Sequence, residues 1–330
     1  MAALVRQYDG TQIEFCDAPG QAGGIGFSEG RCRAFVLFDD DQASGSAILG
    51  PALRWAGKKA ASELVVIASP SLAGVISRRT ALLVMPGELD VCIHQIDGTS
   101  IIPAEPASRL VPPELGSDVW SLAGLISESG ARAVDDHGRL VAEFAGLEVA
   151  RVTRDADGRP LFEVGVGQAD RELHTLVHSG MPPGRALARA VAAVAVHRHA
   201  GARPHPLNRV ARERWLRSSL LDRPSLLGLV ELEPVPPLEP RSTVLGNRPV
   251  AGLGRTGDGE AVVVVCSTGV DLDLAPQAAD YRDRVSSDAR IVIVVPRVDR
   301  YPVTEELVAM VPRAELYSVD PPWDGPAASK

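Results

Sequence analysis

Three glutamates in the middle of the chain have a residue type and a setting suited to chemistry. Glu143 and Glu148 lie in one apolar stretch, Glu163 lies in a second, and the turn sequence DADG stands between the two stretches. A buried carboxylate without a partner is costly, so acids inside apolar strands need a compensating interaction. Binding of a metal ion is one such interaction, and an ion pair with an arginine of the same hairpin is another. The arginines available there are Arg139, Arg151, Arg154 and Arg159.

A second concentration of reactive side chains lies between Arg185 and Arg217. This segment holds eight arginines and three histidines, and its single acid is Glu213. Guanidinium groups bind phosphates in a bidentate manner and a tryptophan can stack on a base, so the segment predicts contacts with nucleic acid. The predicted contact residues are Arg185, Arg189, Arg198, Arg209, Arg212 and Trp215. The alternative is a solvated helix face that pairs with acids of another module, such as Asp271, Asp273 or Asp280.

The apolar pattern predicts the elements that position these residues. The central hairpin is expected to carry Glu143 and Glu148 on its first strand and Glu163 on its second. Helical segments are expected to follow it as far as His199, with an Ala- and Val-rich body typical of a buried helix. Two of the three glutamates would then share a sheet face, depending on the register across the turn.

The rest of the chain alternates apolar strands with amphipathic helices, which predicts an α/β fold of mixed sheets with flanking helices. Residues 1–105 predict a module with the order hairpin, helix, strand, helix, strand, and residues 240–330 repeat that order at low sequence identity. Residues 116–225 form the central module. The proline-rich stretches IIPAEPASRLVPPEL and ELEPVPPLEP are interpreted as the linkers between the modules.

The succession of helix, strand, acidic hairpin and helix resembles the core of the PD-(D/E)XK nucleases, and so does the order of the two terminal modules. The resemblance implies restriction-endonuclease-like modules and metal-dependent phosphodiester hydrolysis. It places one acidic ligand of Mg²⁺ or Mn²⁺ at Glu143 or Glu148 and the second at Glu163. The chain is also similar to a group of actinobacterial proteins that share the phrases GLEVARV and EVGVG and to which no function is attached.

The chemistry of the family motif explains which residues it needs. Two carboxylates can hold Mg²⁺ against a phosphate, and the metal lowers the pKa of a bound water and offsets the charge that develops on phosphorus. A lysine two residues after the second acid would orient that water, but this chain has Gly165 there. The catalytic set implied by the resemblance is therefore Glu148 and Glu163, with Gln168 or a nearby arginine in the role of the lysine.

Three weaker candidates lie outside the hairpin. Asp271 and Asp273 follow an apolar strand, where open α/β sheets bind ligands; they are interpreted as a helix cap, with a metal site as the alternative. Cys266 has no evident histidine partner for a thiol nucleophile. The histidines of the arginine-rich segment match no zinc spacing; they are His197, His199 and His205.

The composition sets the broad class. The chain has 330 residues, 45% hydrophobic and 23% charged, which is typical of a globular protein of two or three domains. The net charge of −8 argues against a protein that coats nucleic acid generally. Four scattered cysteines, the absence of a signal-like N-terminus and the absence of a run of roughly 18 apolar residues predict a cytoplasmic protein that is not membrane-bound.

We therefore expect a nucleic-acid-binding protein of nuclease-like fold that contacts DNA or RNA. It would be either a metal-dependent hydrolase or a catalytically degenerate relative. The alternative is a non-enzymatic interaction or scaffold protein. Arginines at 189, 198 and 209 that line an open groove beside Glu163 would favour the first hypothesis. Their burial against carboxylates would favour the alternative.

Overall fold

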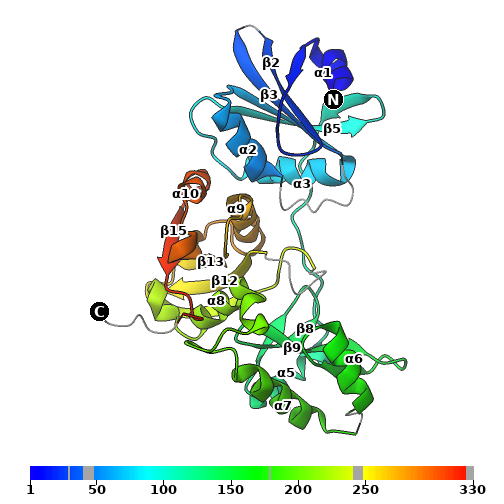
Figure 1. Ribbon diagram of the computed structural model, residues 1–330, viewed down its shortest axis with the longest axis vertical. Coiled ribbons are helices and arrows are strands. Elements are labelled where there is room, and N and C mark those ends of the chain that lie inside the picture. The colour runs from blue at the N-terminus through cyan, green and yellow to red at the C-terminus, as the bar shows by residue number, and fades with distance from the viewer. Residues whose placement is uncertain (29, 40–47, 178–179, 241–247, 325–330) are drawn as a thin grey trace. The chain divides into compact units, whose positions relative to one another are not determined.

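The computed structural model describes residues 1–28, 30–39, 48–177, 180–240 and 248–324. Its strands form three sheets of six, four and five strands that are accompanied by helices, which confirms the α/β class (Figure 1). Contacts group the chain into two compact units. Unit 1 comprises Met1–Arg109, Val270–Ser287 and Arg300–Leu316, and unit 2 comprises Leu110–Gly269, Asp288–Asp299 and Tyr317–Lys330.

The first sheet belongs to unit 1, and its six strands are arranged in sequence order. They are β1 (Ile13–Phe15), β2 (Ala22–Ser28), β3 (Arg31–Phe38), β4 (Glu63–Ala68), β5 (Asp90–Asp97) and β6 (Ser100–Pro103). Strands β3, β4 and β5 pair in parallel, and the other neighbours pair antiparallel. Parallel neighbours need crossover connections, which α2 (Leu49–Lys58) and α3 (Pro70–Ala81) provide. This is the order that the sequence predicts for residues 1–105.

The two faces of this sheet are covered by different helices. Helix α1 (Ala2–Asp9), which lies outside the predicted elements, places Val5 in a buried cluster with Phe35, Val65 and Ile67. Side chains alternate between the faces of a strand, so Leu64 and Val66, also fully buried, face the other way. Helices α2 and α3 contact β4 and cover this second face of the sheet (Figure 1).

The last sheet also keeps sequence order. Its strands are β11 (Leu229–Val235), β12 (Val250–Thr256), β13 (Ala261–Cys266), β14 (Arg290–Pro296) and β15 (Ala314–Val319). Strands β12 and β13 form an antiparallel hairpin and β13 pairs in parallel with β14, as β2, β3 and β4 do in the first sheet. Helices α9 (Leu274–Val285) and α10 (Pro302–Val308) fall between the later strands in sequence. The order of elements thus repeats that of the N-terminal segment.

The second predicted linker is wrong in its first half. ELEPV of the stretch ELEPVPPLEP forms most of strand β11, and Pro234 is partnered with Gly252 of β12. Proline cannot donate a ladder hydrogen bond, so strands tolerate it at a sheet edge. Strand β11 is an edge strand. The last sheet therefore begins before residue 240.

Helices from the two ends of the chain pack together within unit 1. Helix α9 contacts both α2 and α3, and α10 contacts α2. Arg78 and Arg79 of α3 reach Asp280 of α9, with Nε–Oδ distances of 3.0 and 2.6 Å. Residues about 200 positions apart in sequence are joined in this way.

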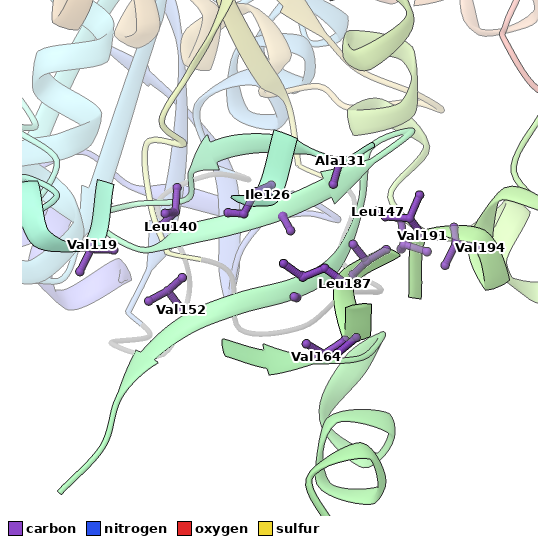
Figure 2. Packing of buried hydrophobic residues seen from close by; sticks show 14 residues of the cluster. Val119, Ile126, Ala131, Leu140, Leu147, Val152, Val164, Leu187, Val191 and Val194 are labelled. Carbon is purple, nitrogen blue, oxygen red and sulfur yellow. The ribbon is translucent and has the colours of Figure 1, made fainter. Parts of the chain in front are cut away.

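The central sheet belongs to unit 2 and is antiparallel throughout. Its strands, in spatial order, are β10 (Pro160–Val164), β9 (Leu147–Arg154), β8 (Leu140–Phe144) and β7 (Arg132–Asp135). One face carries an apolar core that is covered by α5 (Ala123–Glu128) and α7 (Pro183–Ala195). Figure 2 shows this packing, with Leu140, Leu147 and Val152 from the strands and Leu187 and Val191 from α7.

The remaining elements of unit 2 complete its layers. Helix α8 (Arg212–Leu221) contacts β11, β12 and β13, and its Leu216 and Leu220 share a buried cluster with Val262 and Val264. The other helical segments described in the structure are α4 (Ser117–Trp120), α6 (Gly167–Val177) and three 3₁₀ turns at Pro206–Arg209, Pro224–Leu227 and Arg297–Asp299. Within the described ranges, no helix has both the length and the apolar character needed to cross a bilayer.

Candidate functional site: an arginine–carboxylate layer in unit 2

The three predicted glutamates lie on three strands, and the prediction that Glu143 and Glu148 share one strand is wrong. Strands β8 and β9 are separated by a two-residue turn at Ala145 and Gly146, whose φ angles of 44° and 78° are both positive. Such turns suit tight hairpins, but their usual sequence signal is Asn-Gly or Asp-Gly. Ala-Gly does not give that signal. The second hairpin does turn at the predicted DADG sequence, where Arg154 pairs with Pro160.

A register shift between β8 and β9 brings the three acids to one face of the sheet. Val141 is partnered with Arg151 and Glu143 with Glu148, so β9 contains one extra residue, a β-bulge, between these pairs. Partnered residues lie on the same face, and a bulge resets the alternation of side chains. Because Glu163 is partnered with Arg151, all three glutamates lie opposite the apolar core. Without the bulge, Glu148 would point into that core.

Each of the outer two glutamates is paired with an arginine. Arg151 donates to Glu163 at 2.8 Å, and Arg171 of α6 donates to Glu148 at 3.1 Å. The Arg171 Nε atom also lies 3.9 Å from a Glu163 oxygen, so its guanidinium stands between the two carboxylates. Burial raises the pKa of Glu148, and the Arg171 charge opposes that shift. The positive charge that the nuclease resemblance assigns to a metal ion is here supplied by Arg171.

Gly165 shows why this chain has no lysine two residues after Glu163. Its φ is 138°, a conformation that side-chain-bearing residues rarely adopt. A Cβ atom at this position would lie 2.8 Å from the backbone nitrogen of Arg171. A lysine would therefore collide with the start of α6. Gln168, proposed above as its substitute, is exposed and donates to Glu172 at 2.8 Å.

Glu143 is the most deeply buried of the three acids. Its side chain is 1% exposed, and both of its oxygens accept from Nη2 of Arg217 on α8, at 2.9 and 3.2 Å. Beside it, Arg214 donates to both oxygens of Asp136 at 3.3 Å. The Asp136 pair was not predicted, although DD in the predicted strand ARAVDD places an acid there. A metal ion at Glu143 would have to displace a buried guanidinium.

Arg198 and Trp215 are structural rather than exposed, which contradicts their predicted role as nucleic-acid contacts. Arg198 is 2% exposed, and its guanidinium donates to four backbone carbonyls, those of Ala145, Leu207, Val210 and Ala211. It also lies 4.5 Å from the Trp215 ring, which is 4% exposed. Burial lowers the pKa of Arg198 to about 10. Four backbone carbonyls are thus satisfied inside the fold, and no base could stack on this indole.

Close packing at Gly146 joins α8 to the central sheet. A Cβ at Gly146 would lie 2.2 Å from the backbone nitrogen of Trp215. Any side chain there would push α8 away from the β8–β9 turn. The glycine thus holds Arg214 and Arg217 within reach of their carboxylates.

The other predicted contact residues remain at the surface. Arg185, Arg189 and Arg209 are exposed, and no carboxylate lies within ion-pair distance of them in the described part of the chain. Arg212 is half-buried, donates to the carbonyl of Asn208 at 2.9 Å and lies 5.0 Å from the Trp323 ring. The predicted face is thus divided between a buried structural part and an exposed part.

The weaker candidates are also placed. His197 and His205 stack with ring centroids 3.7 Å apart, whereas His199 is exposed. In unit 1, the Asp273 carboxylate accepts from the backbone nitrogens of Ile48 and Gly50. Its side chain therefore caps α2, whereas the prediction had it cap the helix that follows it, α9. Asp271 accepts from the Asp273 nitrogen at 2.9 Å. Burial raises the pKa of the Cys266 thiol to about 12, which makes it a poor nucleophile.

The arginine–carboxylate layer is a balanced array of ion pairs. Its members are Asp136, Glu143, Glu148, Glu163, Arg151, Arg171, Arg214 and Arg217. Four carboxylates meet four arginines, and the pairs become more exposed from Glu143 and Asp136 outward to Glu148 and Glu163. Among the residues that the structure describes, no group of three or more potential ligands is arranged to hold a metal ion. Comparison of the chain with protein-family models and with curated proteins finds no match.

Proposed function

We propose that this chain is a non-catalytic interaction protein. The observation that carries the proposal is the pairing of all three candidate metal ligands with arginines. Breaking a buried ion pair such as that of Glu143 with Arg217 costs about 3–5 kcal/mol, so a metal ion at Glu143 would have to offset that cost before it could bind. The layer is better suited to joining α6 and α8 to the central sheet than to hydrolysis.

The exposed arginines indicate the chemistry of the partner. Arg185 and Arg189 lie one turn apart on α7, on the side away from the buried Leu187 and Val191. Neither is engaged by a carboxylate within the described residues. Guanidinium groups bind carboxylates through paired hydrogen bonds. We assign this surface, which also includes Arg209, to contact with an acidic protein segment.

Nucleic acid is the second candidate, because the same guanidinium groups bind phosphates. One observation makes it the weaker of the two. The tryptophan of the segment is buried at 4% exposure. A single-stranded site would need such an aromatic surface for stacking.

The test compares two polyanions on the same protein. Labelled polyglutamate and labelled DNA and RNA strands are titrated at low salt by fluorescence anisotropy. We expect polyglutamate to bind and the double variant R185E/R189E to weaken that binding by about tenfold or more. The matched control is R6E/R31E, which makes the same charge change at exposed positions of unit 1.

Two results would overturn the proposal. One is tighter binding of DNA or RNA than of polyglutamate, with loss in R185E/R189E, which would establish the nucleic-acid alternative. The other is Mg²⁺- or Mn²⁺-dependent cleavage that is lost in Glu163→Ala but kept in R6E/R31E. That result would restore the hydrolase hypothesis.

A further inference from the structure

A small cavity lies inside unit 2, against the most deeply buried part of the arginine–carboxylate layer. Its volume is about 10 Å³. A cavity of about 10–15 Å³ is large enough for one water molecule, provided that two to four polar groups face it. Both charged and apolar side chains form its wall, among them Asp136, Glu143, Arg214, Arg217, Val141 and Val250. The cavity therefore has room for one very small ligand and for no organic molecule.

One N–H group of Arg217 makes no hydrogen bond within the described part of the chain. Both bonds from Arg217 to Glu143 come from Nη2, at 2.9 and 3.2 Å. The Nε atom is buried and has no partner among the described residues, and the side chain is 3% exposed. Buried N–H groups are normally satisfied by the protein or by ordered water. An acceptor bound in the cavity that Arg217 lines would satisfy this group.

The charges around the cavity decide which acceptor fits. Asp135, Asp136 and Glu143 line it together with Arg214 and Arg217, so carboxylates outnumber guanidinium groups. An anion could accept from the Nε–H group, but three carboxylates would repel it. A cation would be attracted to the carboxylates, but it cannot accept a hydrogen bond. A water molecule carries no net charge and can both accept and donate, so it is the ligand that suits this wall.

The carboxylates of the wall also provide acceptors for the two O–H groups of a water molecule. An ionised carboxylate has about four sites for hydrogen bonds. Asp136 receives two, both from Nη2 of Arg214 at 3.3 Å, and Glu143 receives two from Nη2 of Arg217. Each carboxylate can therefore accept one more. Internal waters typically make about three hydrogen bonds, and the cavity offers one donor and two acceptors.

We propose that this cavity binds one long-lived water molecule, which accepts from Nε of Arg217 and donates to Asp136 and Glu143. Arg217 lies on α8, Glu143 on β8 and Asp136 directly after β7. The water is thus a structural part of the layer and joins α8 to two strands of the central sheet. The proposal is independent of the arginine surface of α7, so each can fail without the other.

NMR of the full chain, deuterated at carbon, tests the contact directly. The Arg217 Nε–H signal is assigned through its bonds to the side-chain carbons, and its cross-relaxation with water is recorded in the laboratory and rotating frames. We expect cross-peaks of opposite sign in the two experiments, which distinguish a bound water from proton exchange. Chloride is then titrated as the competing acceptor and should leave the signal in place. A saturable shift of the signal would instead identify a bound anion.

A set of valine variants tests the place of binding. Magnetic relaxation dispersion of the solvent counts the water molecules that stay bound for longer than the protein takes to tumble. Val141→Ile adds one methylene group to the cavity wall, and Val250→Ile adds one from the last sheet. We expect each variant to lose one long-lived water. Val149→Ile is the matched control, because Val149 is equally buried but belongs to the apolar core of the central sheet, and its count should stay unchanged.

Three results would overturn the proposal. The first is the absence of cross-relaxation between the Arg217 Nε–H proton and water. The second is a saturable chloride shift of that signal. The third is a count of long-lived waters that neither Val141→Ile nor Val250→Ile lowers, with the amide spectra showing that both variants are folded. The first two results do not depend on any variant.

Discussion

Both units bury arginines against carboxylates, but their charge balance differs. In unit 2, Glu143 has Arg217 as its own partner, and the layer as a whole sets four acids against four arginines. In unit 1, Arg78 and Arg79 share Asp280, and Asp273 lies 3.6 Å from Arg79.

The unit 1 cluster also holds an additional acid. Asp271 is adjacent to Asp273, and burial together with that neighbouring charge raises the pKa of Asp271 to about 6. The balanced layer has no comparable excess. In unit 2 each carboxylate has its own arginine, so we expect the stability of the layer to fall strongly when one partner is removed. In unit 1 two arginines share Asp280 and an additional acid is buried beside them, so we expect the stability of that cluster to depend on pH.

The largest effect is expected from Glu143→Ala, which leaves Arg217 buried without its carboxylate. We expect the free energy of opening of β8 and α8 to fall by about 3–5 kcal/mol. Native-state hydrogen exchange of their amides measures it. The control is Glu163→Ala, whose carboxylate is 33% exposed and should cost less than about 1 kcal/mol. Equal losses in the two variants would contradict a graded layer.

A smaller loss is expected from Arg79→Ala in unit 1. Asp280 would keep Arg78, whose Nε and Nη2 atoms lie 3.0 and 3.1 Å from its oxygens. We therefore expect about 2 kcal/mol, below the usual cost of breaking a buried pair. Exchange of the amides in α3 and α9 gives the measurement. A loss of stability as large as that of Glu143→Ala would show that Arg78 does not compensate Asp280 for the loss of Arg79.

The smallest effect is a pH dependence of unit 1. The folded pKa of Asp271 is about 6, above its ordinary value of 3.8, so the folded state binds this proton more tightly. Stability should then rise as the pH falls from about 7 towards 4. The gain would be about 1–2 kcal/mol, because partial exposure reduces the full linkage effect.

Asp271→Asn is the variant that tests this dependence, because its side-chain oxygen can still accept from the Asp273 nitrogen. It should be more stable than the unmodified chain at pH 7 and equal to it near pH 4. Urea unfolding of both proteins at several pH values gives the comparison. A pH profile unchanged by the substitution would assign the titration to another group.

Much of the fold could be predicted from local pattern. Apolar runs such as ELVVIA and AVVVVC became the buried strands β4 and β13, because continuous apolar runs suit strands covered on both faces. The DADG turn formed where expected. Strand β11 could not be predicted in this way, because its proline, Pro234, and the prolines that follow it resemble a linker until the place of the strand at a sheet edge is known.

The candidate site was less predictable, because its chemistry depends on register and on distant partners. The three glutamates were found as acids in apolar strands, which needed only residue type. That Arg171 and Arg217 neutralise two of them, and that Arg198 turns inward, depends on contacts between residues 23 to 74 positions apart in sequence. Arginine is equally suited to a phosphate, a carboxylate or a backbone carbonyl.

By itself, the sequence determined the alternation of strands and helices, the repeat of element order at the two ends, and the presence of acids that need partners. Hydrophobic periodicity and turn chemistry act over a few residues, so these features are local. Only the tertiary structure decided which face the acids share and what pairs with them. One extra residue in β9 moves Glu148 across the sheet, and the positive φ of Gly165 excludes a lysine. Both depend on the packing of strands and helices that come together only in the folded chain.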